Sequence, residues 1–511
     1  MNTACFLGID IGTSGTKTVL FRMDGTTAAS ATREYPLYQP HNGWAEQDPG
    51  DWWDAVCETI RDILAKPGIH AEDIKGIGLS GQMHGAVFLD KEGNVLRRSI
   101  IWCDQRTAEE CEDITRTVGA QRLVQITANP ALTGFTASKI LWVRKHEPHI
   151  FEKVRKILLP KDYIRYRLTG IFATEVSDAS GMQLLDVPGR KWSGEVLEKL
   201  ELDPDLLARV YESPEISGEV SKEAADLTGL NAGTPVAGGA GDQAAGAVGN
   251  GIVRSGVLSS TIGTSGVVFA FSDDVIIDPA GRVHTFCHAV PGKWHVMGVT
   301  QAAGLSLKWF RDNFCGEEIQ KALELGVDPY QIMDSEAAGV PAGCDGLYYL
   351  PYLMGERTPH LDPYARGVFF GLSAKHGKTD MLRSVMEGVV YSLRDCIDVI
   401  REIGIEVFEV RASGGGGRSP LWRQMQADMF GQPIATVNSS EGPALGAALL
   451  SAAGTGFYDS IQAACDAVIK RRTTQDPDPD TQLKYERYHQ LYRKLYQDLK
   501  PDFKKRAELF Y

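Results

Sequence analysis

Two stretches of the chain, far apart in the sequence, share one pattern of apolar and polar positions. In the first, Leu7, Ile9 and Ile11 alternate with other residues, the turn GTSG follows, and residues 18–23 form a second β-rich run. In the second, the segment SGVLSSTIGTSGVVFAFSDD repeats the order of strand, GTSG turn and strand. Alternation of this kind is typical of half-buried strands, so each copy predicts a β-hairpin. Because the copies lie about half of the 511-residue chain apart, we expect two related halves, each with its own sheet.

Helical patterns and shorter β-like runs follow these hairpins. The segment DPGDWWDAVCETIRDIL begins with Asp48 and Pro49, a favourable cap and first residue for a helix. Apolar residues at helical spacing predict two more helices, in TDMLRSVMEGVVYSLRDCIDVIREIG and in SPLWRQMQADMFG, closed by Gly404 and Gly431. The runs IKGIGLSG and FEVRASGGGG read as strands between them. This alternation of helices and strands favours an α/β fold.

The composition is that of a globular protein with an acidic surface. Hydrophobic residues make up 43% of the chain, and the formal net charge is −13. Such a surface repels phosphate backbones and anionic headgroups, so we expect no nucleic-acid or membrane partner. The nine cysteines are scattered without a CxxC pair, which favours free thiols in a reducing compartment. The N-terminus lacks a signal-peptide pattern and no run approaches the length of a membrane helix, so a cytoplasmic location is expected.

A glycine-rich stretch near the middle of the chain, GTPVAGGAG, marks a candidate boundary between the halves. Small residues in such a stretch can absorb changes in backbone dihedral angles, which suits a hinge. A tight transition from strand to loop, without motion, explains the same residues equally well. Both interpretations remain open at the level of the sequence.

The repeated GTSG turn is a candidate phosphate site. It presents backbone N–H groups without side-chain obstruction, together with two hydroxyls, and concave sets of such donors bind phosphate oxygens. A plain hairpin turn would explain one copy, but the second copy after a matching strand favours a functional role. Asp10 directly precedes the first turn, where its carboxylate would repel phosphate unless a cation such as Mg²⁺ lay between them. Thr261 occupies this place in the second copy, so the halves are not chemically equivalent.

Three other segments carry candidate chemistry. Asp242 lies among small residues in GGAGDQAAGAVG, which suits a functional acid, a helix cap, or both. Met83 and His84 lie in SGQMHG at the end of a predicted strand, where α/β proteins place ligand contacts, although a lone histidine is often structural. The glycine run SGGGGRSPLW opens onto a helix and permits close approach of a phosphorylated ligand. No P-loop pattern is present, and no GxGxxG follows a strand with a suitably placed acid.

Taken together in their order, the motifs resemble the FGGY family of carbohydrate kinases, within the superfamily of sugar kinases, Hsp70 and actin. The matching segments, spread over nearly the whole chain, are GIDIGTSGTK, WAEQDPGDWW, GQMHGAVFLD, GFTASKILWV, LLPKDYIRYRLTG, GGAGDQAAGAVG, GERTPH, GVFFGL, SGGGGRSPLWRQMQAD and EGPALGAALL. The resemblance implies an α/β fold of two actin-like (ribonuclease H-like) domains, residues 1–238 and 239–511, flanking a central catalytic cleft. The first would carry the sugar side and the first hairpin, and the second the nucleotide side, the second hairpin and the catalytic Asp.

The same resemblance implies roles for individual residues. ATP would be held by one group of small and hydroxyl residues, namely Gly12, Thr13, Ser14, Gly263, Thr264, Gly415, Gly416 and Ser419. The sugar would contact Met83, His84, Asp242 and Gln243. Asp242 matches the general base and Asp10 the second acid needed for activity, and Mg²⁺ is assigned to these two carboxylates.

The expected reaction is ATP-dependent phosphorylation of D-xylulose to D-xylulose 5-phosphate, with ADP as co-product. Gln243 stands where family members that act on xylulose often carry Asn, so another ketopentose or a polyol stays open as the preferred acceptor. A nucleotide-driven conformational protein of the actin or Hsp70 kind is the alternative from another class, although the segments GQMHG and GDQAAG argue for a sugar pocket. A homodimer is compatible with the sequence, which does not fix the oligomeric state.

Overall fold

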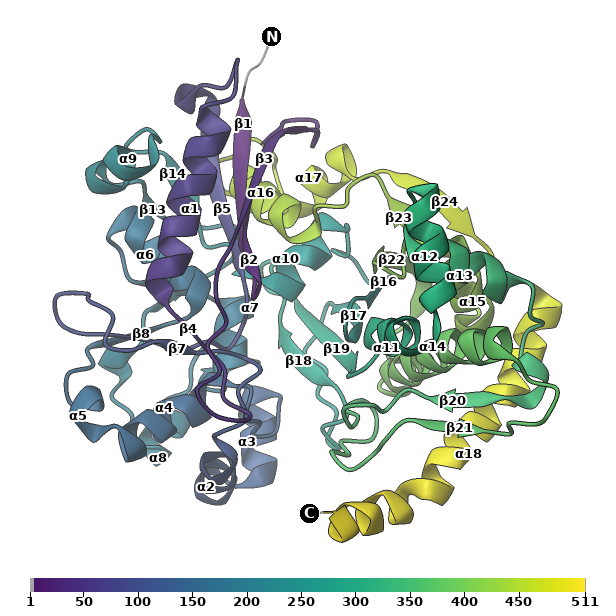
Figure 1. Cartoon of the computed structure of the whole chain (residues 1–511). Coiled ribbons are helices and arrows are strands. Elements are labelled where there is room, and N and C mark those ends of the chain that lie inside the picture. Colours follow the sequence, from purple (N-terminus) through teal and green to yellow (C-terminus); the bar gives the residue numbers. More distant parts are fainter. Residues whose placement is uncertain (1–3, 511) are drawn as a thin grey trace.

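The computed structural model describes residues 4–510 and shows two halves, each built around one mixed β-sheet (Figure 1). The first sheet has the order β13 (Ile216–Glu219), β14 (Pro235–Ala237), β5 (Ile74–Gly81), β1 (Cys5–Ile11), β2 (Gly15–Arg22) and β3 (Thr27–Glu34), with β15 (Ala240–Gly241) also beside β5. The second has the order β18 (His284–Cys287), β19 (Trp294–Thr300), β17 (Gly266–Ser272), β16 (Gly256–Ile262), β22 (Val407–Gly414), β23 (Ile434–Val437) and β24 (Arg471–Gln475).

The two sheets repeat one arrangement, which confirms the predicted repeat and the α/β class. In each sheet the strand before the GTSG turn pairs antiparallel with the strand after it, β1 with β2 and β16 with β17. On its other side that strand pairs parallel with a later strand, β5 or β22. Even the register agrees, because Asp10 lies opposite Ser80 in the first sheet and Thr261 opposite Ser413 in the second.

The predicted helices form where their caps indicate. Helix α1 (Pro49–Leu64) begins after Asp48, whose carboxylate accepts a hydrogen bond from the backbone N–H of Gly50 at 2.9 Å. Helix α15 (Pro420–Phe430) is capped by Ser419 and closed by Gly431 in the left-handed conformation. Helix α14 (Lys378–Glu402) ends two residues before Gly404. Among the described residues, no helix is both long enough and apolar enough to cross a membrane.

Two small-residue helices cross at the centre of the molecule and join its halves (Figure 1). Helix α10 (Asp242–Gly249) follows the first sheet directly, whereas α16 (Gly442–Gly454) lies between β23 and β24 of the second sheet in the chain and packs back onto β1 and β5. The backbones approach so closely that a Cβ at Gly446 would lie 1.8 Å from the carbonyl oxygen of Ala245. Glycine is therefore required at this crossing, which sets how the two halves meet.

The glycine-rich stretch GTPVAGGAG, for which the sequence allowed either a hinge or a tight loop, is packed within the first sheet. It forms β14 and β15, separated by Gly238 and Gly239. Gly239 has a positive φ of 70°, and a Cβ there would lie 2.2 Å from the carbonyl oxygen of Leu79. This geometry favours the tight transition over a freely bending hinge at these residues.

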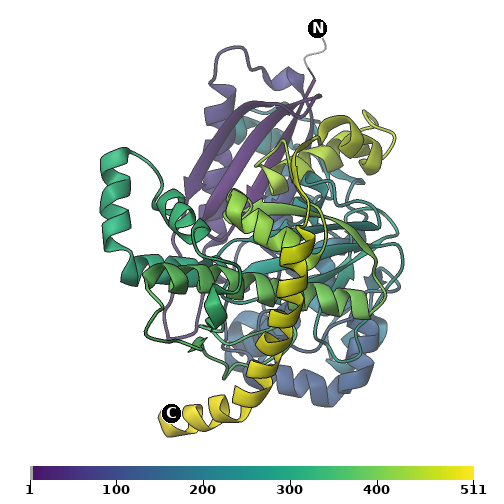
Figure 2. The same ribbon diagram turned by 90° about the vertical axis from the view of Figure 1, so that its right-hand side faces the viewer.

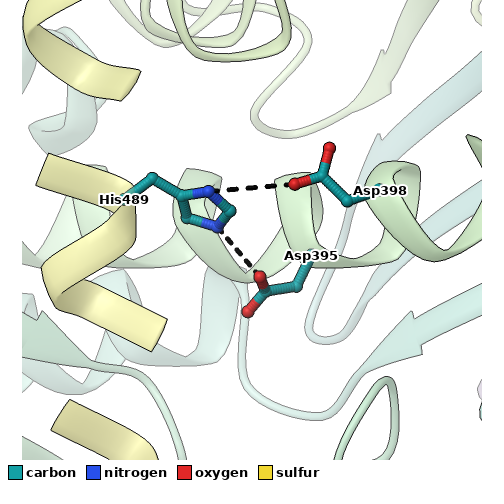
Figure 3. Close-up of side chains that lie close together, drawn as sticks. All are labelled: Asp395, Asp398 and His489. Atoms are coloured by element: carbon teal, nitrogen blue, oxygen red, sulfur yellow. Dashed lines mark hydrogen bonds and ion pairs between the residues drawn. The ribbon is translucent and has the colours of Figure 1, made fainter. Parts of the chain in front are cut away.

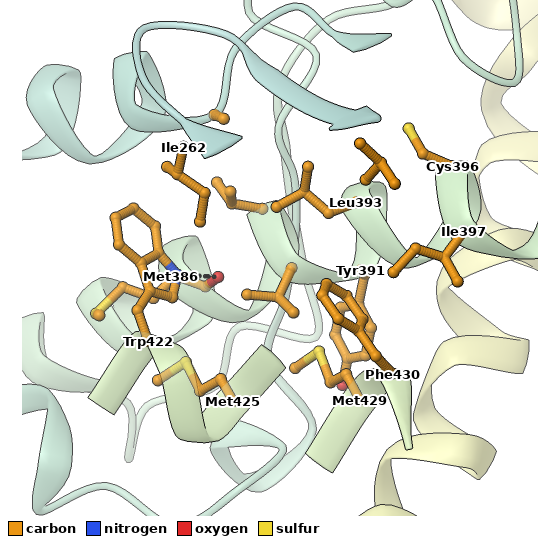
Figure 4. Close-up of a cluster of buried hydrophobic side chains, with 14 of the residues drawn as sticks. Ile262, Met386, Tyr391, Leu393, Cys396, Ile397, Trp422, Met425, Met429 and Phe430 are labelled. Atoms are coloured by element: carbon orange, nitrogen blue, oxygen red, sulfur yellow. Dashed lines mark hydrogen bonds between the residues drawn. The ribbon is translucent and has the colours of Figure 1, made fainter. Parts of the chain in front are cut away.

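The second half has the larger apolar core, which lies between its sheet and helices α14 and α15 (Figure 4). Ile262 of β16, Leu393 of α14 and Met425 of α15 meet there. The indole Nε1 of Trp422 donates a hydrogen bond of 3.1 Å to the carbonyl of Met386, which fastens α15 to α14. This core holds the end of β16, and so the second GTSG turn, in a fixed place.

The long helix α18 (Pro479–Phe510) runs across the second half, and its C-terminal turns project from the molecule (Figures 1 and 2). His489 ties it to α14, because its Nε2 lies 2.9 Å from the carboxylate of Asp395 and its Nδ1 lies 3.8 Å from that of Asp398 (Figure 3). Arg394 and Arg493 also form ion pairs with these acids. Because cationic side chains already accompany both carboxylates, the cluster acts as a link between helices.

Candidate active site

Three parallel strands of the first sheet end at one edge and place the predicted catalytic residues together. Asp10 lies near the end of β1, Met83 and His84 follow β5, and Asp242 follows β15. Strand β5 lies between the other two, so that its Ser80 pairs with Asp10 on one side and with Ala240 on the other. The carboxyl edge of parallel strands is where α/β proteins bind ligands.

The two acids, Asp10 and Asp242, are half-buried and have few hydrogen-bond donors. The hydroxyl of Ser80 donates to Asp10 at 2.8 Å, and the backbone N–H of Gln243 donates to Asp242 at 2.7 Å. Burial, together with the negative charge of Asp10 as the smaller cause, raises the pKa of Asp242 to about 7. Burial also raises the pKa of Asp10. The two carboxylates therefore lie close enough to repel one another, an arrangement that suits a bound cation.

Asp104, another acid of the first half, has a structural role. Its side chain is fully buried and forms an ion pair with Arg106 at 2.7 Å. It also accepts a hydrogen bond from the backbone of Ala45 at 2.6 Å. A carboxylate engaged in this way is not available to accept a substrate proton.

His84 is held in an unusual backbone conformation at the end of β5. Its φ is +69°, a left-handed value that a non-glycine residue rarely adopts. Its carbonyl oxygen accepts hydrogen bonds from Lys139 Nζ at 2.7 Å and from the Thr136 hydroxyl at 3.1 Å. Its Nδ1 lies 2.8 Å from the carbonyl oxygen of Gly181. Met83 is buried beside it.

The ring of His84 is neutral, with one nitrogen left to accept a hydrogen bond. Burial, followed by the nearby charge of Lys139, lowers the pKa of His84 to about 3. Because the carbonyl of Gly181 can only accept, Nδ1 carries the hydrogen and Nε2 is the acceptor. A sugar hydroxyl is a suitable donor for such a nitrogen.

The first GTSG turn is braced by polar side chains from the same half. The carbonyl of Thr13 accepts a hydrogen bond from Gln47 at 2.6 Å, and its hydroxyl accepts one from the indole of Trp102 at 2.9 Å. Gly12 and Ser14 lie in the same turn, with the Ser14 side chain exposed. Neither Gly12 nor Gly263 of the second turn has a positive φ, so a demand for the left-handed region does not explain either glycine.

The second turn and the glycine run line one cavity of about 690 Å³. It brings together all of the second-half residues assigned to the nucleotide, namely Gly263, Thr264, Gly415, Gly416 and Ser419. Leu305, Tyr330 and Trp422 supply apolar and aromatic wall, and Asp328 and Asp334 supply carboxylates. A flat base with an attached polar sugar matches this lining. Asp242 and Gln243 line the adjoining cavity on the other side of the glycine run.

Lys139 and Trp102 are site residues to which the sequence analysis gave no role. Lys139 is fully buried in α4 (Thr136–His146), and its ammonium group donates to the carbonyls of His84 and Gly134, each at 2.7 Å. The sequence offered one signal for Lys139, a lysine among apolar positions of a helix. Its partner His84 lies on a distant segment, so the sequence did not reveal the contact. Trp102, 47% exposed, had no distinguishing pattern.

Comparison with known proteins identifies relatives over nearly the whole chain. Residues 5–249 match the family model for the N-terminal domain of the FGGY family of carbohydrate kinases, and residues 258–455 match that for its C-terminal domain. Xylulose kinase of Escherichia coli (strain K12) is 41% identical, over 97% of this chain and 99% of the relative. Xylulose kinase of Bacillus subtilis (strain 168) is 39% identical, over 96% of each chain. The crystal structure of xylulose kinase from Rhodospirillum rubrum superimposes with a TM-score of 0.90 at 32% identity, covering 97% of this chain and 99% of that one.

Proposed function

This chain belongs to the FGGY family of carbohydrate kinases, and we propose that it transfers the terminal phosphate of ATP to D-xylulose, giving D-xylulose 5-phosphate and ADP. The observation that carries the proposal is the position of Asp242. It follows the strand edge that bears Asp10 and His84, and it lines a cavity that shares Gly415 of the glycine run with the nucleotide-sized cavity. An acid in this place can contact a sugar on one side and a phosphoryl group on the other.

Asp242 acts as the general base in this mechanism. Its carboxylate accepts the proton of the primary hydroxyl while that oxygen attacks the terminal phosphorus of ATP. A pKa of about 7 keeps a substantial fraction of the side chain ionised at neutral pH and makes it a stronger base than an ordinary carboxylate. The remaining task of the protein is alignment and neutralisation of charge.

The residues present fit a divalent cation. Asp10 and Asp242 repel one another, and the hydroxyl of Ser80 and the backbone N–H of Gln243 donate to them without supplying positive charge. Hard oxygen ligands of this kind are those that Mg²⁺ prefers, and these two carboxylates would hold it. When bound, Mg²⁺ supplies positive charge next to the phosphate oxygens. The two GTSG turns would hold the phosphates through backbone N–H groups and the hydroxyls of Thr13, Ser14 and Thr264.

The sugar lies on the His84 side of the site. Nε2 of His84 accepts a hydrogen bond from one hydroxyl, Met83 offers an apolar contact, and Gln243 follows the base along α10. Gln carries the same amide as Asn on a side chain one methylene longer, so it reaches differently placed hydroxyls. Other ketopentoses and polyols are therefore the relevant competitors of D-xylulose.

Release of ADP from ATP in the presence of candidate acceptors tests the proposal. We expect D-xylulose to stimulate ADP release strongly over the rate without sugar, and to give a higher kcat/KM than D-ribulose, L-ribulose, glycerol and xylitol. A higher kcat/KM for one of the others would reassign the acceptor while keeping the reaction. ADP release indifferent to every acceptor would overturn the kinase assignment and favour a nucleotide-driven conformational protein.

A further inference from the structure

A second large cavity lies on the opposite side of the glycine run from the nucleotide cavity. Its volume is about 750 Å³, and α10, the start of α16, β22, β23 and β24 contribute to its walls. It shares Gly415 and Arg418 with the nucleotide cavity and reaches Asp242 at one end. We call it the arginine cavity, after Arg418, Arg423 and Arg472 in its lining.

The three arginines of this cavity lack acidic partners. Among residues 4–510, none of them forms an ion pair with a carboxylate, whereas Arg471, the neighbour of Arg472 on β24, pairs with Glu409. Arg423 donates to Gln475 at 2.7 Å and to the carbonyl of Gly417 at 2.8 Å, which are neutral acceptors. Burial without a carboxylate partner lowers the pKa of Arg423.

The rest of the lining is rich in neutral polar groups. Thr261 and Ser413 share a hydrogen bond of 2.7 Å, and Ser439, Ser440 and Asn438 contribute hydroxyl and amide groups. Asp242 is the one acid in the lining, against three cationic side chains, in a chain whose net charge is −13. The cavity is thus locally cationic within an acidic protein, so it attracts small anions that the rest of the surface repels.

We propose that the arginine cavity is a second anion-binding site, which takes a phosphate group that does not belong to the nucleotide. Guanidinium groups bind phosphate oxygens in pairs of parallel hydrogen bonds, which suits arginines without acidic partners. The volume lies in the range of small-molecule sites, so a phosphate monoester of a small metabolite fits as well as free phosphate. The nucleotide cavity has apolar and aromatic walls and as many acids (Asp328, Asp334) as cations (Lys308, Arg418), which suits a base and ribose, whereas the arginine cavity has three cations against one acid.

The experiment keeps the nucleotide cavity filled. The full chain is first titrated with a non-hydrolysable ATP analogue and Mg²⁺, which establishes whether nucleotide binds at all, independently of the second site. Inorganic phosphate, and in a separate arm glycerol 3-phosphate, is then titrated into the loaded protein by calorimetry at constant ionic strength. Tighter binding of the ester identifies an organic phosphate as the occupant, and equal or tighter binding of inorganic phosphate identifies the free ion.

Adjacent arginines on β24 supply a charge-matched control. Arg472→Gln removes a cation that lines the cavity, and we expect it to weaken anion binding by about threefold or more. Arg471→Gln removes the neighbouring charge, which pairs with Glu409 outside the lining, and should leave anion binding unchanged. The proposal is overturned if neither anion binds saturably to the loaded protein, or if the two variants weaken binding equally, because diffuse surface charge would then explain it.

Discussion

At the scale of single residues, the proposed catalysis depends on an acid whose surroundings raise its pKa. Burial, with Asp10 as a secondary cause, raises the pKa of Asp242 to about 7. A general base must be ionised, so activity is lost as the pH falls through the pKa of the free enzyme. We therefore expect kcat/KM for D-xylulose to fall about tenfold per unit below pH 7 and to level off above it. A pH-independent kcat/KM between pH 5 and 8 would contradict the role of Asp242.

Lys139 provides a second prediction at this scale, because it holds the carbonyl of His84 in place. Replacement by Met removes both hydrogen bonds of its ammonium group and releases the left-handed backbone of His84. Loss of these two buried hydrogen bonds should raise KM for the sugar by about tenfold while KM for ATP stays nearly constant. Lys145→Met, on the exposed face of the same helix, is the matched control.

Steady-state kinetics and the thermal midpoint of each variant together test whether Lys139 positions His84. A purely structural role for Lys139 would lower the thermal midpoint and leave the KM for sugar unchanged in the protein that remains folded. That result would remove Lys139 from the positioning of His84.

At the scale of elements, the two GTSG turns are expected to hold phosphate from opposite sides. Neither Gly12 nor Gly263 has a positive φ, and a Cβ at Gly263 would meet its nearest atom at 3.7 Å, an ordinary contact. The second turn thus accommodates a side chain by itself, and glycine serves to leave room for a ligand. We expect Gly263→Val to fold with an unchanged thermal midpoint and to weaken ATP binding by at least tenfold in calorimetry.

Normal ATP binding by Gly263→Val would make the second turn a plain hairpin. Gly12→Val is a less clean test, because its Cβ would lie 3.2 Å from the carbonyl oxygen of Gly15, and the turn must shift slightly to accept it.

Elements defined by local signals were predictable from the sequence, and long-range contacts were not. Alternating apolar residues, the GTSG turns and the caps Asp48 and Ser419 act within a few residues, so the hairpins and helices α1 and α15 follow from them. The return of α16 onto the first sheet depends on close approach between residues such as Gly446 and Ala245, which no local pattern reveals. The link from Lys139 to His84 was missed for the same reason.

At the scale of the whole molecule, the crossing of α10 and α16 joins the two halves between the sugar side and the nucleotide side. We propose the boundary between the halves at residues 238 and 239, and closure of the halves about the crossing of α10 and α16 when both substrates bind. Small-angle scattering should then give a smaller radius of gyration with D-xylulose and a non-hydrolysable ATP analogue together than with either alone. Identical profiles for the free and doubly bound protein would argue against closure.

The most direct test of the account is D-xylulose-dependent ADP release by Asp242→Asn, measured beside calorimetric binding of D-xylulose and ATP. The amide keeps the shape of the side chain but cannot accept the proton at neutral pH, and a positioned base contributes about 10²–10⁴-fold in rate. We predict that kcat falls by a factor in this range while both substrates still bind. Near-normal turnover by Asp242→Asn would contradict the assignment of the base and, with it, the proposed arrangement of the site.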